Sequence, residues 1–547
     1  MRGSARPTRL KAPTTDEAAP APTKRGGGPV QMPDDPSTMR SPSFNADART
    51  SWLLATSRSC SVDPTVASRS SFVERLRELD VSADLSRVSR WESGAHTVPA
   101  KVVLGYERAI GAPEGVLLAA QRGVFRTSDP RTPVPEEVHF SRDDTPADEL
   151  VSDLLGRATD LASAMSGADW LHLAVELTRF EMVLLPAETW STVCSRLISE
   201  LARTTGGDRL RRYEAAITLV SHPVAQRHVV QALGAWLVDP QVQVVSPMLS
   251  LLQHVRNDGA SKLVLRLLDA DNRALSQGAV QVAAAKAARG HFQGAALALL
   301  EQRAIRELVT PQGHSGIDIL DLTTHLPGSS YQRVLMTLRD AQLRNRVTQA
   351  RETRCLLVPE TSRTLSRDIA TKAQTASPKM YAAEPDLLLQ RLVGEALFHV
   401  HGARRSMAVN LLRVSPYGSS VADACLSLAS ADSEFVGARA WETIWQLGTG
   451  NRRDEVVRLA GNARHPWMQR RALTALGHSG APLDDVEAAQ VVEATLTTSH
   501  RGVRSAGLLA LGLGSPSSLG LMDSLPADQR AAATWWLKVG PSIVDGD

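Results

Sequence analysis

A run of ten residues from Leu85 to Gly94, LSRVSRWESG, gathers side chains that can bind nucleic acid. Arginine can donate paired hydrogen bonds to guanine O6 and N7 or contact a phosphate, and serine is short enough to let a helix backbone approach the bases. Most of the remaining chain is rich in Ala and Leu. The run therefore indicates a helix that contacts DNA, against the alternative of one more solvated helix face.

Short elements on either side must position this run. The apolar spacing predicts one helix from about Phe72 to Leu79, a turn from Asp80 to Ala83, and a second helix over 85–92. Asp84 is a suitable N-cap for the second helix, and Gly94 closes it. Two short helices joined by a tight turn have the form of a helix-turn-helix, whose second helix fits the major groove.

The two faces of the helix over 85–92 differ in chemistry. We expect Leu85, Val88 and Trp91 to face the core. Pro99 and Pro113 open two further helices, and a first helix is expected somewhere in 44–59. The side chains left on the outer faces are Ser86, Arg87, Ser89 and Arg90.

The run RVSRWESG, followed by Pro99 and YERAIG, resembles the xenobiotic-response-element family of helix-turn-helix regulators, the Cro and C1 repressor type. The resemblance covers residues 44–125 only. Asp80 departs from the family pattern, because the family commonly has Gly in this turn. The resemblance implies a DNA-binding domain that acts as a homodimer on inverted half-sites of double-stranded DNA.

The resemblance also implies roles for single residues. Asp84 stands at the position of the usual Ser cap. Base contacts are expected from Ser86 and Arg87, and contacts near the DNA backbone from Ser89 and Arg90. The structural end of the recognition helix is formed by Trp91, Glu92 and Gly94.

Composition bounds the other classes of function. The net charge is +3, and the positive excess lies before residue 128, so no strongly basic or acidic surface is expected in the rest of the chain. No apolar run is long enough for a membrane span, and the N-terminus has no apolar signal region. The cysteines are widely separated, so a reduced, cytoplasmic protein is expected: Cys60, Cys194, Cys355 and Cys425. The expected contact with DNA would associate it with the nucleoid.

Prolines, glycines and charge divide the chain into four parts. Residues 1–43 contain almost no large apolar side chain and are expected to be a disordered tail. Residues 44–125 form the helix-turn-helix domain, and 126–147 read as a linker. Residues 148–547 show helical periodicity almost throughout, so the predicted fold class is all-α, a small domain followed by an α-solenoid.

An internal repeat supports the solenoid. The segments SHPVAQRHVVQALG (221–234), RHPWMQRRALTALG (464–477) and SHRGVRSAGLLALG (499–512) share an Ala-Leu-Gly ending. The pattern resembles HEAT repeats, in which the terminal Gly is expected to form a left-handed C-cap. HEAT repeats usually have Asp near the start of this helix, where this chain has His222, His465 and His500, interpreted as turn or capping residues.

No motif indicates catalysis, a cofactor or a metal. GxGxxG, GxxxxGK[ST] and HExxH are absent, and no Ser, Cys or His stands in a nucleophile pattern. The run HVHGARR (399–405) has two histidines at i and i+2, a spacing that does not share a helix face. The expectation is therefore no enzyme, no cofactor and no metal ligand.

The predicted function is a sequence-specific bacterial transcription regulator, whose repeat region serves assembly or receives a signal or protein partner. The alternatives are a solenoid scaffold that binds proteins and a DNA-repair glycosylase of HEAT type. A fragment that ends near residue 140 is expected to fold alone. The glycosylase alternative needs a concave, arginine-lined face of the solenoid that holds nucleic acid. The arginines that could line such a face are Arg203, Arg209, Arg211, Arg212, Arg404, Arg405, Arg452, Arg453, Arg470 and Arg471.

Overall fold

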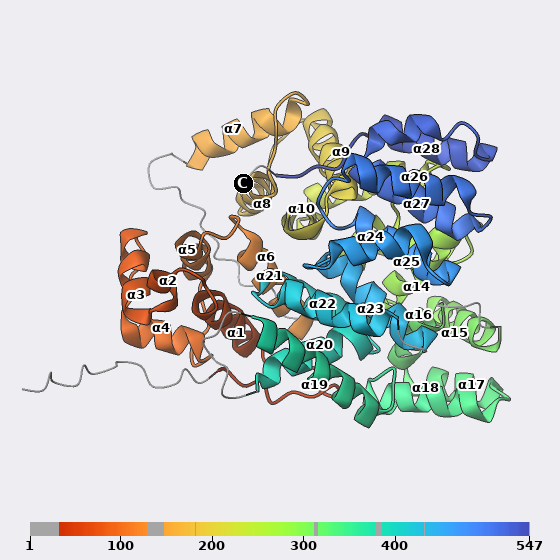
Figure 1. Cartoon of the computed structure of the whole chain (residues 1–547), viewed down its shortest axis with the longest axis horizontal. Helices are drawn as coiled ribbons and strands as arrows, with labels where there is room; N and C mark the ends of the chain where they lie inside the picture. Colours follow the sequence, from red (N-terminus) through yellow and green to blue (C-terminus); the bar gives the residue numbers. More distant parts are fainter. Residues whose placement is uncertain are drawn as a thin grey trace, which may run out of the picture. The chain divides into compact units, whose positions relative to one another are not determined.

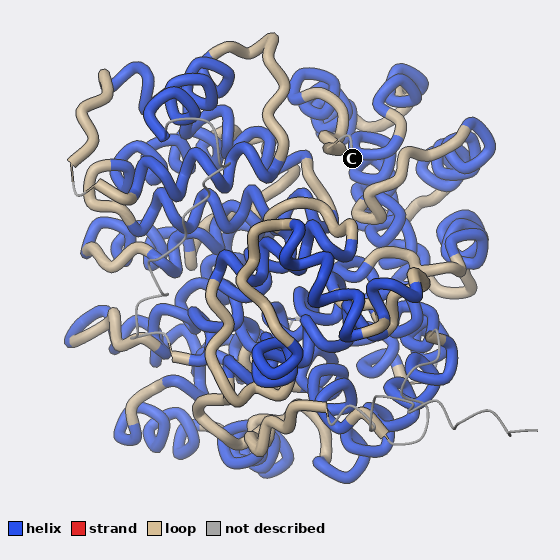
Figure 2. Tube along the Cα trace, turned by 90° about the vertical axis from the view of Figure 1, so that its left-hand side faces the viewer, coloured by secondary structure: helices blue, strands red, loops and turns tan. Residues whose placement is uncertain are grey.

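The computed structural model describes residues 32–129, 147–180, 182–310, 315–377, 385–430 and 433–545. Within these ranges the chain forms helices joined by turns and loops and no β-strand, apart from two isolated bridges (Figure 2). The all-α prediction is confirmed. Among the same residues, no helix combines the length and the apolar character that crossing a membrane requires. Most of the expected linker, residues 130–146, lies outside the described ranges, as do residues 1–31 of the expected tail.

Residues 32–129 form six helices (Figure 1, red to orange). Short polar caps and glycines set their ends, as the sequence pattern predicts. Their bounds are α1 Ala46–Ser59, α2 Pro64–Ala67, α3 Arg69–Glu78, α4 Leu85–Glu92, α5 Ala100–Ile110 and α6 Val116–Ser128.

The rest of the described chain is also helical. Its first part comprises α7 Ala147–Thr159, α8 Gly167–Thr178, α9 Ala187–Arg203, α10 Gly206–Ser221, α11 Ala225–Val238, α12 Ser246–Leu249, α13 Asp258–Leu267, α14 Arg273–Ala288, α15 Gly294–Val309, α16 Ser315–His325, α17 Gly328–Thr337, α18 Ala341–Thr353 and α19 Pro359–Ala376. Its second part comprises α20 Leu387–Phe398, α21 Gly402–Val414, α22 Gly418–Ala429, α23 Glu434–Leu447, α24 Arg453–Asn462, α25 Pro466–Gly477, α26 Asp485–Thr497, α27 Arg501–Gly514 and α28 Ala527–Val539.

Helix pairs stack in the C-terminal part of the chain. Helices α22 and α23, α24 and α25, and α26 and α27 pack in pairs, and α23, α25 and α27 pack on one another in order (Figure 1, blue). In this arrangement each helix contacts its own partner, and successive pairs contact one another through α23, α25 and α27 and through α24 and α26. That is the packing pattern of an α-solenoid.

The repeat glycines do not act as C-caps. Gly234 and Gly512 lie inside α11 and α27, Gly477 is the last residue of α25, and none has a positive φ. Two of them permit close packing instead, because a Cβ on Gly512 would lie 2.3 Å from a ring carbon of Trp536, and one on Gly477 3.1 Å from Ala510 Cα. The predicted left-handed caps are therefore wrong at these three positions. The small residue favours helix contact at Gly477 and Gly512, whereas a Cβ on Gly234 would meet no neighbour.

The end of the chain packs on the first helices of the repeat region. The carboxylate of Asp545 accepts from Arg212 Nη2 at 2.7 Å and from Arg211 Nη2 at 2.9 Å, both on α10. Trp535 on α28 donates through Nε1 to Asp239 Oδ2 at 3.0 Å, just after α11. These contacts join elements that are separated by about 300 positions in the sequence.

The N-terminal helices share a core with the repeat region. Arg49 on α1 is fully buried and binds both oxygens of Glu395 on α20, at 2.6 and 2.8 Å. Trp52, also fully buried, donates to Asp386 Oδ2 at 2.8 Å. A fragment that ends near residue 140 would leave both α1 side chains without these partners, so the expectation that it folds alone does not fit the contacts.

Part of the expected tail is ordered against this core. Asp35 is buried and accepts from Arg49 Nε at 2.8 Å. The carbonyl oxygen of Ser41 accepts from Arg404 Nη1 at 2.9 Å. The prediction of disorder is therefore wrong for residues 32–43, because a buried arginine needs a carboxylate and Asp35 supplies one.

Candidate nucleic-acid interface

The turn before α4 is built around a left-handed residue. Asp80 has φ 56, one of two non-glycine residues with positive φ among the described ones. This is the position where the helix-turn-helix family that the sequence resembles commonly has Gly, and Asp is among the few side chains that tolerate the conformation. Val81 N then donates to Leu76 O at 2.9 Å, which closes the turn onto the end of α3.

Asp84 begins α4 as expected. Its side chain accepts from the backbone N–H of Arg87 at 2.7 Å, the bond that defines an N-cap. That N–H holds the pKa of the Asp84 carboxyl below its usual value, so the group is ionised at the positive end of the helix. The structure gives α4 the same bounds as the sequence prediction, Leu85 to Glu92.

The inner face of α4 ends in a buried ion-pair network. Val88 and Trp91 pack into the core, and Glu92 is fully buried. Its carboxylate accepts from Arg58 Nε at 2.5 Å and Nη2 at 2.9 Å, and from Arg69 Nε at 3.1 Å. The sequence pattern marked Trp91 and Glu92 as structural, but it did not identify Arg58 on α1 as the partner.

Gly94 ends this unit because a side chain does not fit. Its φ is +75, and a Cβ there would lie 3.3 Å from Ala48 Cα on α1. The left-handed backbone and the close approach both favour glycine. Glu92 and Gly94 together therefore fix the end of α4 against α1.

The outer face of α4 carries the residues expected to contact DNA. Ser86, Arg87 and Arg90 are exposed and Ser89 is half-buried. Leu85 was expected in the core, but it is 55% exposed, and the buried face of α4 begins one turn later, at Val88. An exposed apolar side chain at this position can contact a thymine methyl group in the major groove.

Both arginines of α4 make hydrogen bonds to neighbouring residues. Arg87 Nη1 donates to the carbonyl oxygen and to the hydroxyl of Ser82, each at 2.8 Å. Arg90 Nε donates to the carbonyl oxygen of Ser86 at 3.3 Å. Arg87 Nε also lies 3.8 Å from Asp84 Oδ2, an exposed ion pair. Exposed contacts of this kind contribute little to stability, so a guanine edge or a phosphate can replace them.

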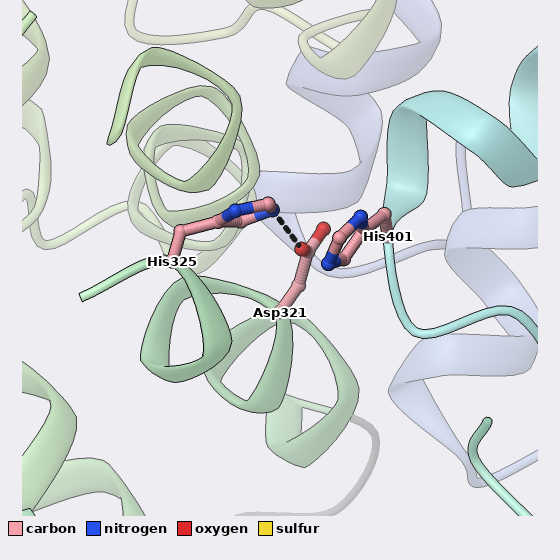
Figure 3. Close-up of side chains that lie close together, drawn as sticks. All are labelled: Asp321, His325 and His401. Atoms are coloured by element: carbon pink, nitrogen blue, oxygen red, sulfur yellow. Dashed lines mark ion pairs between the residues drawn. The ribbon is translucent and has the colours of Figure 1, made fainter. Parts of the chain in front are cut away.

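A second polar cluster, which the sequence reasoning missed, lies in the repeat region. Asp321 and His325 on α16 meet His401, the residue before α21 (Figure 3). The two imidazole rings lie against each other, with centroids 4.1 Å apart, and the carboxylate lies beside them. Burial acts to raise the pKa of Asp321, but His325, His401 and Arg405 outweigh it and bring the pKa to about 2. The sequence analysis rejected a metal site at His399 and His401 because residues two apart do not share a helix face. That argument does not apply here, since both histidines lie in the turn between α20 and α21.

The repeat histidines stand at helix ends, as expected. His222 follows α10, and its Nε2 lies 2.8 Å from the carbonyl oxygen of Phe180. His465 and His500 precede α25 and α27, but neither side chain makes a capping hydrogen bond. They do not come together in a metal cluster with described residues.

Many of the arginines considered for a concave face are engaged in ion pairs. Their partners lie mostly on neighbouring helices or far along the chain, as with Asp545, Glu395 and Glu487. Such pairs join the helices and leave less free positive charge for a nucleic-acid groove. The arginines that form such pairs are Arg211, Arg212, Arg404, Arg453 and Arg471, whereas Arg452 pairs with Glu455 three residues along the chain.

Comparison with known proteins gives structural neighbours alone. No family model matches the sequence, and no curated protein does. One neighbour comes from a structure of tubulin recruitment and assembly by microtubule polymerases with tumor overexpressed gene (TOG) domain arrays. It is 11% identical to this chain, the match covers 74% of this chain and 94% of that one, and the TM-score is 0.22.

Two further structures are similar at the same level. Kap121p is 11% identical, with 87% of this chain and 55% of that chain covered and a TM-score of 0.27. An engineered protein is 13% identical, with 86% and 98% covered and a TM-score of 0.20. Similarity at this level does not establish a shared fold or function.

Proposed function

We propose that this chain is a sequence-specific DNA-binding transcription regulator, in which α4 enters the major groove. One observation carries the proposal. A capped eight-residue helix is locked on its inner face by a buried carboxylate and leaves serines and arginines exposed on its outer face. This is the arrangement that a recognition helix requires, since a rigid scaffold must present short and cationic side chains to base edges.

In this proposal the side chains of α4 have separate tasks. Ser86 and Arg87 contact bases, and Ser89 and Arg90 lie near the phosphates. Two copies of the chain bind inverted half-sites as a homodimer, which doubles the number of contacts. The positive excess in the first quarter of the sequence favours this end of the molecule for contact with DNA.

The HEAT-like repeat region has an assembly or receiving role in the same proposal. Helix α1 supplies Arg58 to the network that holds α4, and it supplies Arg49 to Glu395 on α20. A single helix thus contacts both the recognition unit and the repeat region. A partner or a second copy bound to the repeat region can therefore influence how α4 is presented.

A negative charge introduced on the outer face of α4 tests the function. Ser86→Glu places a carboxylate where DNA would approach, near a helix N-terminus that tolerates negative charge. Ser505→Glu is the matched control, because Ser505 is exposed on α27, far along the chain. We expect Ser86→Glu to lose binding to a selected DNA site and Ser505→Glu to keep it, with both helical by circular dichroism. Equal binding by both variants would exclude α4 as the reading helix.

A second candidate function, a protein-binding scaffold, is favoured by an exposed apolar segment. Between α8 and α9, Phe180 is 57% exposed, Met182 70% and Leu184 89%. Neighbouring apolar side chains on a surface mark protein contact sites. The test is a Met182→Ser, Leu184→Ser double variant. If this variant keeps the oligomeric state and the protein complexes of the natural sequence, the exposed segment no longer supports a scaffold function.

A further inference from the structure

We propose that Asp321, His325 and His401 bind a divalent transition-metal ion, with zinc as the preferred ion. Asp321 and His325 are four residues apart on α16 and share a helix face, and His401 reaches them from the turn before α21. Their ligand atoms all lie within 4.8 Å of one another. Two imidazoles and one carboxylate are a donor set that zinc accepts, with a fourth position left for water.

The contact between Asp321 and His325 fits a shared ion. His325 Nε2 lies 3.1 Å from Asp321 Oδ1, yet that oxygen is buried and accepts no hydrogen bond from a described residue. The two atoms are close without being aligned as donor and acceptor. Two ligands bound to one zinc at about 2.0–2.1 Å lie about 3 Å apart, so the pair is already at ligand spacing.

Backbone contacts hold the third ligand and the carboxylate in place. The His401 N–H donates to His399 Nδ1 at 3.0 Å, and His399 pairs with Cys355 in an isolated bridge. Gly402 N donates to Asp321 Oδ2 at 2.8 Å, which orients the carboxylate. Bonds of this kind behind the ligands are a regular feature of metal sites.

Two contacts at His401 Nε2 compete with the metal, and the longer of them is to Thr324 Oγ1 at 3.4 Å. Arg354 Nη1 lies 3.0 Å from His401 Nε2, so a metal at that nitrogen must displace a guanidinium. Arg354 is half-buried and has φ 56, the second left-handed non-glycine residue among those described. Its side chain can move toward solvent when the metal binds. The competition predicts that removal of this cation strengthens metal binding.

The site would join elements that are distant in sequence. It bridges α16 to the turn between α20 and α21, and His399 in that turn also lies 3.1 Å, through Nε2, from the carbonyl oxygen of Met39. A bound metal would therefore rigidify the region where residues 32–43 pack. That role is separate from the contact between α4 and DNA, and either proposal can fail alone.

The test uses the full chain after removal of metal by a chelator. Zinc is titrated by calorimetry, and cobalt(II) is added to a second sample, since tetrahedral cobalt gives strong visible absorption. The variants are Asp321→Asn, His401→Gln and Arg354→Gln. His465→Gln is the control, because His465 lies outside the cluster and makes no side-chain capping bond.

We expect one zinc per chain, at least tenfold weaker binding in Asp321→Asn and His401→Gln, and at least threefold tighter binding in Arg354→Gln. His465→Gln should bind like the natural sequence. No binding by either the natural sequence or Arg354→Gln would overturn the proposal and leave an ion-paired polar cluster. Binding that is unchanged in Asp321→Asn and His401→Gln would overturn it too, because the ion would then lie elsewhere.

Discussion

Replacement of Glu395 by Gln should destabilise the whole chain. Glu395 is fully buried and accepts hydrogen bonds from Arg49 at 2.6 and 2.8 Å and from Arg404 at 2.8 Å. Asp35 binds the third nitrogen of Arg49, so two buried cations are balanced by two buried carboxylates. Removal of one carboxylate leaves a buried cation uncompensated, which costs about 3–5 kcal/mol.

The pH dependence of this loss follows from the pKa of Glu395. Burial acts to raise that pKa, but Arg49 and Arg404 outweigh it and hold the pKa below the usual value. A lowered pKa means that the stabilisation is present above about pH 4.3, the unfolded value for Glu, and is lost as the pH falls through the folded value. The difference between Glu395→Gln and the natural sequence should therefore shrink in acid.

Urea unfolding followed by circular dichroism measures the effect at pH 7 and in acid. Glu360→Gln is the control, since Glu360 makes an exposed pair with Arg363 and its replacement should change stability by less than about 0.5 kcal/mol. A loss below about 1 kcal/mol for Glu395→Gln at pH 7 would refute the reasoning. It would mean that α1 is not anchored on α20.

Other predictions address the recognition unit and the repeats. Arg87→Ala should cost about 1–3 kcal/mol in DNA affinity and relax the preference at one base position. Arg90→Ala should weaken binding to all DNA sequences alike and reduce the salt dependence of binding, and fluorescence anisotropy measures both effects. Asp80→Gly should raise the free energy of unfolding by up to about 1 kcal/mol, because the turn needs a positive φ; a loss in urea unfolding would contradict this. Gly512→Ala should lower stability by about 1–3 kcal/mol through overlap with a tryptophan of α28, whereas Gly461→Ala in α24, where a Cβ meets no neighbour, should be neutral or stabilising by up to about 1 kcal/mol.

Local signals predicted the bounds of α4 well. The cap at Asp84, the ending at Gly94 and the apolar spacing between them gave the bounds of α4, because each acts within a few residues. Leu85 was predicted to face the core because it fits the helical spacing of Val88 and Trp91, but that spacing does not show how far along α4 the buried face extends. The helical content of residues 148–545 followed from the same short-range pattern.

Long-range partners could not be predicted. Arg49 and Trp52 on α1 resemble ordinary helix residues in the sequence, and their burial depends on Glu395 and Asp386, more than 300 positions away. The cluster around His401 was missed for the same reason, since α16 supplies two of its three members. The repeat glycines were assigned to C-caps because the sequence shows where a glycine stands but does not show which residue of another helix packs against it.

Selection of binding sites from random double-stranded DNA by the purified full chain tests the central claim most directly. The account predicts one enriched motif arranged as an inverted repeat, with a preference that changes at one position of each half-site in Arg87→Ala. Absence of any enriched motif would contradict it. So would a motif bound equally well by the natural sequence, by Arg87→Ala and by Ser86→Glu.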